Sequence, residues 1–385
     1  MRVLHLGDIH LGSGLQYGKD DESGMNSRLR DWLDTMNRIA LLAQKVDAVI
    51  FAGDAFKDRK PAPQLLSYFI KWLRKMAQYA PVVLMDGNHD INGNGEVGPV
   101  ELFEDIQIPN VYVSSHPEIL NIPNKSGTLQ VLTMPTFSKS TFLQQDEYKD
   151  VPIDELNTIM ADKAGQIIRY LAEQLDPKLP AVLTLHGTVS GSINGSERSM
   201  MMAQEPIFAL HDIALPQFDY VALAHVHRHQ ELPTLPGQPP VVYSGSIERV
   251  DFGEMEPKGV VIADLKPRKW EFVNLNTRPF MQIDLKPGDI PDVTGVVVKT
   301  TIKTDIETAK TISAAQVTKQ LYAAGAHFVA GVQIEVERET RARDSEMTEH
   351  MSVPEAIARY FEQQPDLVAR KERLMVKVAE LEVVA

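Results

Sequence analysis

Five hydrophobic runs in this chain each end in side chains that bind metal ions. The runs read LHLGDIHLG, VIFAGDAF, VVLMDGNHD, VLTLHG and YVALAHVH. Each is an apolar strand pattern followed by a turn that carries carboxylate, amide or imidazole groups. Because open α/β sheets place their sites at the carboxyl ends of strands, we expect the five turns to meet in one crevice. The side chains concerned are Asp8, His10, Asp54, Asn88, His89, His186, His225 and His227.

One such motif alone is weak evidence, because a single D-x-H or H-x-H is more often an ordinary turn or a satisfied core histidine. Five of them in succession, each after an apolar run in a chain with only 11 histidines, favour a shared metal site. The other histidines lack this setting, and we interpret them as structural or surface residues. They are His5, His116, His211, His229, His327 and His350.

The candidate ligands combine imidazole nitrogens with carboxylate and amide oxygens and include no thiolate. This mixture suits Mn, Fe or Zn better than Ca, Mg or Cu, and we expect Mn first, with Mg, Fe and Zn as alternatives. Asp54 is the only lone carboxylate among the five segments, so the economical arrangement is two metals that share it as a bridge. Two cations roughly 3.5–4 Å apart clamp the oxygens of an in-line displacement at phosphorus and lower the pKa of water. The sequence therefore predicts phosphoester hydrolysis.

In this order, GDIH, GDAF, GNHD, HG and HVH resemble the calcineurin-like metallophosphoesterase superfamily. Three further stretches resemble the Mre11/SbcD branch of DNA repair nucleases, namely HGTVSG at 186–191, DYVALAHVHR at 219–228 and YSGSIERVDFGE at 243–254. The resemblance covers the whole chain and implies a β-sandwich flanked by helices. It also implies the ligands of two metals. One metal is held by Asp8, His10, Asp54 and His227, and the other by Asp54, Asn88, His186 and His225.

The resemblance gives His89 a catalytic role, facing the scissile phosphate to stabilise charge or protonate the leaving oxygen, with Asp90 orienting its ring. A further ligand or a spacer is the alternative for His89. Two positions depart from the family pattern. Lys57 stands where a second histidine usually follows the bridging aspartate, and we expect it to contact phosphate, since lysine is a poor proton shuttle. Ala224 replaces the usual glycine before H-x-H and is small enough to keep the turn.

Composition limits the class of protein. The 385 residues, 43% of them hydrophobic, are enough for two or three globular domains. The absence of cysteine excludes disulfides and zinc knuckles and agrees with an intracellular enzyme. No apolar stretch approaches membrane-spanning length and no signal segment precedes the first strand, so we expect a cytoplasmic protein without membrane contact. The net charge of −13 opposes contact with phosphates, so we expect this chain alone to bind DNA weakly.

Strand and helix patterns alternate over residues 1–279, which predicts an α/β domain. The family resemblance implies that it is the nuclease domain. The last strands of this part, from 241 to 275, follow one another without helices and predict an antiparallel sheet. A polar glycine-rich loop after the first ligand turn leads to Arg28 and Arg30, which either reach phosphate or line a solvated helix face. Amphipathic helices are expected near 28–46, 62–79 and 154–175.

Residues 280–340 contain a β-α-β pattern, which predicts a small α+β domain. In the family such a unit caps the nuclease, and a stabilising appendage is the alternative. Residues 352–385 predict a helical hairpin broken at Pro365, with Leu374 and Val378 on a narrow apolar stripe. The stretch before it is polar and resembles a linker, so the stripe suggests a partner. The resemblance implies a coiled-coil ATPase of the Rad50/SbcC type, in a complex where this chain is a homodimer.

The ligand patterns predict a metal-dependent phosphoesterase, and the resemblance implies that it is a DNA nuclease, with exonuclease and endonuclease action on duplex ends and single strands. A phosphatase or small-molecule phosphodiesterase on the same site is one alternative, but such an enzyme has little use for a cap and a terminal helical hairpin. A non-catalytic scaffold for the ATPase is the other. It would show missing ligands, and none is missing.

Overall fold

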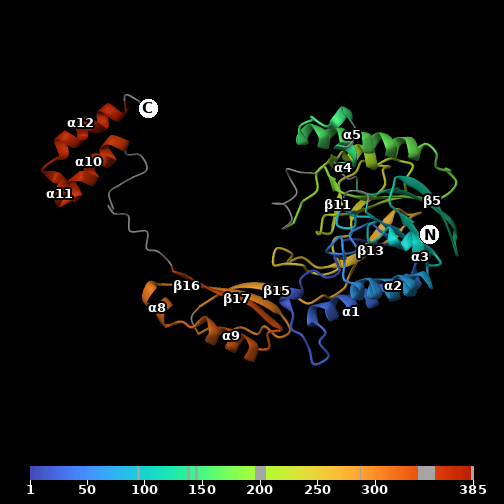
Figure 1. Cartoon of the computed structure of the whole chain (residues 1–385), viewed down its shortest axis with the longest axis horizontal. Helices are drawn as coiled ribbons and strands as arrows, with labels where there is room; N and C mark the ends of the chain where they lie inside the picture. The colour runs from blue at the N-terminus through green and yellow to red at the C-terminus, as the bar shows by residue number, and fades with distance from the viewer. Residues whose placement is uncertain are drawn as a thin grey trace. The chain divides into compact units, whose positions relative to one another are not determined.

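A computed structural model of the chain describes residues 1–92, 96–136, 139–143, 146–195, 205–286, 288–336 and 352–382. The contacts divide the chain into two compact units (Figure 1). The first consists of Met1–Ile302 with Ile312–Ile334, and the second of Lys303–Thr311 with Glu335–Ala385. All five ligand turns lie in the first unit.

The first of two six-stranded sheets carries three of the ligand turns. Its strands are β1 (Arg2–Leu6), β2 (Ala48–Phe51), β3 (Val82–Met85), β4 (Val111–Ser114), β13 (Gly259–Asp264) and β14 (Lys269–Asn274). They lie in the order β14-β13-β1-β2-β3-β4. The strands β1 to β4 are parallel, so the turns after β1, β2 and β3 meet at one edge. The antiparallel sheet expected in the last strands is only in part present, since β13 and β14 extend this sheet with antiparallel pairing.

The second sheet carries the other two turns. Its strands are β5 (Glu118–Asn124), β6 (Gly127–Met134), β7 (Ala181–His186), β10 (Tyr220–Ala224), β11 (Gln230–Leu232) and β12 (Val241–Tyr243). They lie in the order β11-β12-β10-β7-β6-β5. Here β7 and β10 are parallel neighbours, in a register that pairs Ala224 with His186. The ends of these two strands therefore deliver their ligands side by side.

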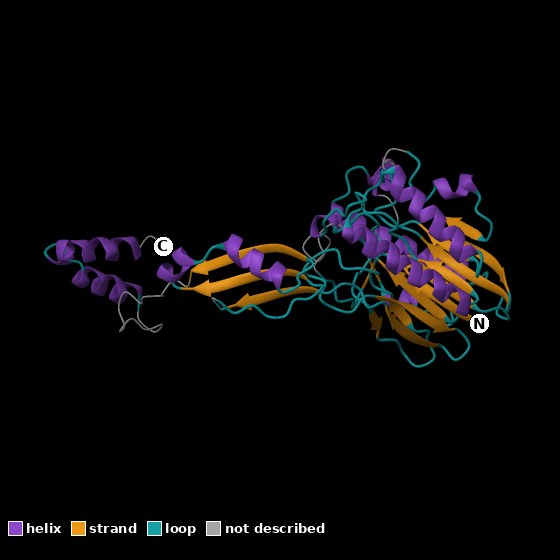
Figure 2. Cartoon of the chain, turned by 90° about the horizontal axis from the view of Figure 1, so that it is seen from below, coloured by secondary structure: helices purple, strands orange, loops and turns teal. Residues whose placement is uncertain are grey.

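The two sheets face each other across a buried apolar layer, and helices cover their outer faces (Figure 2). The layer joins Ile50 of the first sheet to Val182 and Tyr220 of the second, all buried. Each such side chain stabilises the fold by on the order of 1.5–3 kcal/mol. This arrangement confirms the expected α/β sandwich flanked by helices.

Three long helices pack on the outer faces, close to the expected ranges. They are α1 (Ser27–Leu42) and α2 (Pro63–Ala77) on the first sheet and α5 (Ile153–Ala172) on the second. The side chain of Asn26 caps α1 by accepting from the N–H of Arg28, and Pro63 begins α2. Trp32 of α1 donates from Nε1 to the carbonyl of Ser13 at 2.9 Å and so anchors the loop after the first ligand turn.

Several short elements complete this part of the unit. They are η1 (Leu15–Tyr17), η2 (Ala43–Lys45), α3 (Leu102–Ile106), α4 (Lys139–Leu143), η3 (Asp146–Tyr148), β8 (Thr188–Val189), β9 (Ile207–Phe208) and α7 (Leu210–Ile213). The strands β8 and β9 pair in parallel directly after the turn at His186. This pairing places the residues around 205–208 beside that turn.

A third sheet contains the predicted β-α-β unit. Its strands are β15 (Phe280–Leu285), β16 (Val297–Thr304) and β17 (Phe328–Val336), and α9 (Ala314–Ala323) packs with them. They lie in the order β15-β16-β17. The ring of Tyr17 packs edge-on against Phe280, with centroids 5.3 Å apart, which joins this sheet to the loop after the first ligand turn. The domain boundary expected at residue 280 lies inside the first unit and stays a prediction.

The second unit contains helices. They are α8 (Ile306–Thr311), α10 (Val353–Gln363), α11 (Pro365–Val368) and α12 (Lys371–Glu382). Ser352 and Glu355 form a capping box at the start of α10, and α10 and α12 lie side by side. Of the polar stretch expected to be a linker, 337–352, residues 337–351 lie outside the described residues. Among the helices that the structure describes, none is both long and apolar enough to cross a bilayer.

Candidate metal centre

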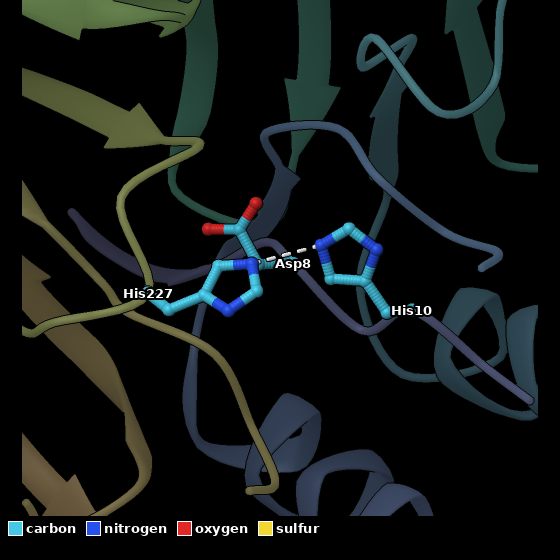
Figure 3. Close-up of side chains that lie close together, drawn as sticks. All are labelled: Asp8, His10 and His227. Carbon is cyan, nitrogen blue, oxygen red and sulfur yellow. Dashed lines mark hydrogen bonds between the residues drawn. The ribbon is translucent and has the colours of Figure 1, made fainter. Parts of the chain in front are cut away.

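The five ligand turns come together where the parallel strands of both sheets end. Three overlapping groups of side chains have all their ligand atoms within 4.8 Å of one another. Figure 3 shows the first group, in which the rings of His10 and His227 face each other beside the carboxylate of Asp8. The groups are Asp8 with His10 and His227, His10 with Asp54 and His89, and Asp54 with His186 and His225. The five turns therefore bring these seven side chains together, as the sequence predicts.

Four of these residues have a left-handed backbone, with φ of 48° at Asp8, 45° at His10, 59° at Asp54 and 97° at His225. Such conformations are uncommon outside glycine and persist only where the surroundings enforce them. The backbone N–H of His225 donates to both carboxylate oxygens of Asp8, at 3.0 and 2.9 Å. This pair of bonds ties the turn after β10 to the turn after β1.

The carboxylate of Asp54 lies at the centre of the cluster. Its Oδ2 is 3.4 Å from Nε2 of His10 and 3.4 Å from Nε2 of His186. Burial opposes ionisation of Asp54, but the neighbouring His186 and His10 outweigh it and lower its pKa well below the ordinary value. The carboxylate therefore stays ionised and can serve two cations at once.

Asn88 joins the two histidines that end the second sheet. Its Oδ1 lies 3.0 Å from Nε2 of His186 and 2.9 Å from Nδ1 of His225. Nδ1 of His186 lies 2.8 Å from the carbonyl of Ala52, so it carries the proton and Nε2 faces the cluster. Burial lowers the pKa of His186, but Asp54 outweighs it and raises the pKa to about 9. A metal ion would have to displace the second proton of this ring.

The geometry of His10 and His227 fits a cation. Their Nε2 atoms lie only 2.9 Å apart (Figure 3). Burial lowers the pKa of His10 to about 3, so its ring is neutral. Two imidazole nitrogens at this distance need a proton or a cation between them. Together with the carboxylate oxygens of Asp8, these nitrogens form a ligand set that Mn, Fe and Zn accept. The residues present therefore fit the divalent metals that the sequence predicts.

The structure corrects the expected role of Asp90. Nδ1 of His89 lies 2.9 Å from the carbonyl oxygen of Lys57, so Lys57 and not Asp90 orients the exposed His89 ring. Asp90 is buried behind the turn and accepts from the backbone N–H groups of Ala55, at 3.0 Å, and Gly87, at 3.1 Å. Burial raises the pKa of Asp90 to about 7. Asp90 therefore holds the turns after β2 and β3 together. It does not reach the ring of His89, because neighbouring side chains of a tight turn point in different directions.

The structure also contradicts both interpretations of Arg28. Its side chain is fully buried and donates to Asp31 at 2.8 Å and to the carbonyl of Arg249 at 2.9 Å. It therefore neither reaches a substrate nor lines a solvated face. Asp31 also accepts two bonds of 2.7 Å from Arg278, just before the third sheet. The side chain of Lys57, in contrast, is exposed on the turn after β2.

Two carboxylates were missed by reasoning from the sequence. Oε1 of Glu254 lies 2.5 Å from Nδ1 of His227, and Oε2 of Glu205 lies 2.7 Å from Nε2 of His225. Burial raises the pKa of Glu254, but the bond from His227 outweighs it and brings the pKa down to about 2. Glu254 ends the stretch YSGSIERVDFGE, which could have drawn attention to it, whereas no motif surrounds Glu205.

Residues 1–229 match the family model of the calcineurin-like phosphoesterases. The chain belongs to this family. Within this phosphoesterase the match ends two residues after His227, so it includes every candidate ligand.

Three relatives indicate which branch of the family this phosphoesterase resembles. The SbcD component of the nuclease SbcCD of Escherichia coli (strain K12) is 27% identical over 305 residues, which cover 76% of this phosphoesterase and 72% of that protein. The SbcD component of the same nuclease of Bacillus subtilis (strain 168) is 25% identical over 289 residues, which cover 72% of this phosphoesterase and 70% of that protein. DNA double-strand break repair protein Mre11 of Haloferax volcanii is 27% identical over 292 residues, which cover 74% of this phosphoesterase and 55% of that protein. These relatives confirm the resemblance to the Mre11/SbcD branch.

Proposed function

We propose that the chain is a metal-dependent DNA nuclease that hydrolyses phosphodiester bonds at duplex ends and in single strands. The observation that carries this proposal is the set of three ligand groups that overlap at Asp54 and His10. Overlap of this kind supports two cations that share ligands, which is the arrangement suited to displacement at phosphorus. The similarity to proteins named as nucleases and as a DNA double-strand break repair protein supports DNA as the substrate.

The ligands fall into two sets that share Asp54. When bound, two divalent ions would lower the pKa of water and neutralise the phosphate, and Mn is our first choice. The backbone bonds from His225 to Asp8 and from His89 to Asp54 keep these carboxylates in place before any ion binds. We assign one ion to Asp8, His10, Asp54 and His227, and the other to Asp54, Asn88, His186 and His225.

His89 acts on the substrate in this proposal. The carbonyl of Lys57 accepts from Nδ1, so Nε2 faces away from it. In the imidazolium form of the ring, Nε2–H would donate its proton to the leaving oxygen or stabilise charge on the phosphate. The ring stands edge-on to His10, with centroids 4.7 Å apart, so it is close to the cluster although it is exposed. The exposed ammonium of Lys57 contributes a phosphate contact from the neighbouring turn, after β2.

The rest of the chain serves the nuclease within a larger complex. We propose a nuclease domain over 1–279, a capping domain over 280–340 and a docking segment over 352–385. The docking segment binds a coiled-coil ATPase of the Rad50/SbcC type, and this chain is a homodimer in that complex. The helical hairpin of the second unit and the naming of two relatives as subunits support this. Because we propose DNA as the substrate, we also propose that the enzyme acts inside the cell, in the cytoplasm.

Cleavage assays test this function against its alternatives. The metal-free chain is supplied with Mn or Mg and offered linear duplex DNA, circular single-stranded DNA and a small aryl phosphodiester, each with and without the ATPase. A DNA nuclease cleaves both DNA substrates, and the ATPase increases the rate. Hydrolysis of the small phosphodiester without DNA cleavage would make the chain a small-molecule enzyme. No hydrolysis of any substrate by the metal-loaded complex would favour a scaffold.

A further inference from the structure

Each histidine of the H-x-H pair is held by a carboxylate, but the two carboxylates differ in burial. Glu254 meets His227 at Nδ1 and its side chain is 1% exposed. Glu205 meets His225 at the other ring nitrogen, Nε2, and its side chain is 32% exposed. Consequently His227 offers Nε2 to the cluster and His225 offers Nδ1.

Glu254 is itself fixed from several sides. Its Oε2 accepts from the N–H of Val250 at 3.0 Å and lies 3.1 Å from Nζ of Lys258. Lys258 is also buried, and its ammonium donates to the carbonyl of His227 at 3.2 Å and to Glu256 at 2.6 Å. Both oxygens of Glu254 therefore act as acceptors. The ammonium of Lys258 balances the charge of Glu254 and also donates to the backbone carbonyl of His227.

A carboxylate on the far nitrogen of a metal-binding histidine fixes the tautomer and makes the near nitrogen more basic. The effect depends on how firmly the carboxylate is held. Glu254 lies in a low-dielectric interior and has one available position, whereas water screens the more exposed Glu205 and lets it move. The same type of bond therefore supports His227 more strongly than His225.

We propose that Glu254, fixed by Lys258, is the positioning residue for His227, and that it makes the metal position at His227 tighter than the position at His225. The inference rests on the two metal positions of the proposed function. It says nothing about the substrate, so it can be tested without DNA. Under limiting metal the position at His227 fills first, and the position at His225 exchanges with the solution.

The variant Glu254→Gln tests the bond with little change of shape. An amide presents one acceptor and one donor, so either His227 or the pair formed by Val250 and Lys258 must face an N–H group. Glu205→Gln makes the same change at the exposed carboxylate. Glu256→Gln is the matched control, because Glu256 contacts the same lysine but not His227.

The first measurement is calorimetric titration of each metal-free chain with Mn. We expect two unequal sites in the wild type, with the tighter one weakened about 10–100-fold by Glu254→Gln. Glu205→Gln should weaken only the second site, and Glu256→Gln neither. Two equal sites in the wild type, or an unchanged tight site in Glu254→Gln, would overturn the proposal.

A second measurement separates positioning from loss of folding. In the metal-free wild type, ¹⁵N spectra of the imidazole rings should show His227 protonated at Nδ1. Glu254→Gln should change this tautomer while the tautomer of His186 stays as in the wild type, and thermal melting establishes that the variant is folded at the temperature of the spectra. An unchanged His227 tautomer in the folded variant would overturn the proposal. A wild type that binds two ions but leaves DNA intact would refute only the nuclease function.

Discussion

The backbone N–H of His89 donates to Oδ1 of Asp54 at 2.9 Å. This bond turns the carboxylate so that Oδ2 faces His10 and His186. The turn that carries the proposed catalytic histidine thus orients the proposed bridging ligand. The proposed metal ligand and the proposed catalytic histidine are therefore linked by a backbone hydrogen bond, which a change of the His89 side chain leaves in place.

Replacement of Asp54 should remove more metal than replacement of any other ligand, because a bridging carboxylate serves both ions. We expect Asp54→Ala to lose both ions, and a terminal ligand variant such as His225→Ala to lose mainly one. Metal content per chain, measured after gel filtration in metal-free buffer, decides this. Two ions retained by Asp54→Ala would show that Asp54 does not bridge.

Lys57 should contribute to catalysis without holding metal. We expect Lys57→Ala to keep its ions and lose about tenfold in kcat/KM on DNA, the effect of losing one charge-assisted contact. Lys57→His should be tolerated, since the family usually carries histidine there. The matched control is Lys60→Ala, because Lys60 is exposed and pairs with Glu96 at 2.8 Å. Equal rates for Lys57→Ala and Lys60→Ala would make Lys57 an ordinary surface residue.

Deletion of residues 350–385 should leave a folded, metal-bound nuclease that no longer binds its ATPase. Every candidate ligand precedes residue 230, and the deleted helices belong to the second compact unit. Co-purification with the ATPase and thermal melting of the isolated chain are measured together. A truncated chain that still co-purifies would exclude the hairpin as the docking element.

Single substitutions in α12 should have the same effect on ATPase binding as the deletion. Leu374→Asp and Val378→Asp should also abolish co-purification, because charges oppose burial of an apolar stripe against a partner. Both side chains are half-buried, whereas Val376 on the same helix is 61% exposed. Val376→Asp is therefore the control. If only Val376→Asp abolishes binding, the docking face is not the stripe that the sequence indicates.

His5 should make the stability of the metal-free chain depend on pH. It is buried between the hydroxyl of Tyr220, at 3.0 Å, and the carbonyl of Leu223, at 3.1 Å, and burial lowers its pKa to about 3. Between this value and the ordinary value of 6.5 the unfolded chain binds a proton that the folded chain does not. Stability should therefore fall as pH falls from 6.5 towards 3.

The variant His5→Gln tests this dependence. It should be less stable than the wild type at pH 7, because one of two buried hydrogen bonds is lost, and its stability should fall less steeply below pH 6.5. Urea unfolding at pH 7, 6, 5 and 4 measures both. Parallel pH profiles for the two chains would show that His5 does not contribute the proton.

The sequence predicted the convergence of the ligands because that convergence follows from local patterns. An apolar run predicts a strand, and the ends of parallel strands meet at one edge of a sheet. Asp8, Asp54 and His186 could be placed in one crevice on this basis. The sandwich came from the family resemblance, since the pairing of β10 with β7 joins positions that no local pattern connects.

What the sequence missed depends on partners far away in the chain. Arg28 is buried because its partners include Glu248, which lies 220 residues away. Glu205 reaches His225 only because β8 and β9 pair. Asp90 was misjudged for a local reason, since the direction of a side chain in a tight turn does not follow from its being next to His89.

We propose that this chain holds two metal ions and uses them with His89 to cleave DNA. The most direct test is titration of the metal-free chain with Mn, with bound metal and cleavage of linear duplex DNA measured in the same samples for wild type and His89→Asn. We predict that cleavage begins only as the second ion binds, and that His89→Asn binds two ions and cleaves about 10²–10⁴ times more slowly. Full cleavage with one ion bound, or loss of metal together with activity in His89→Asn, would contradict the claim.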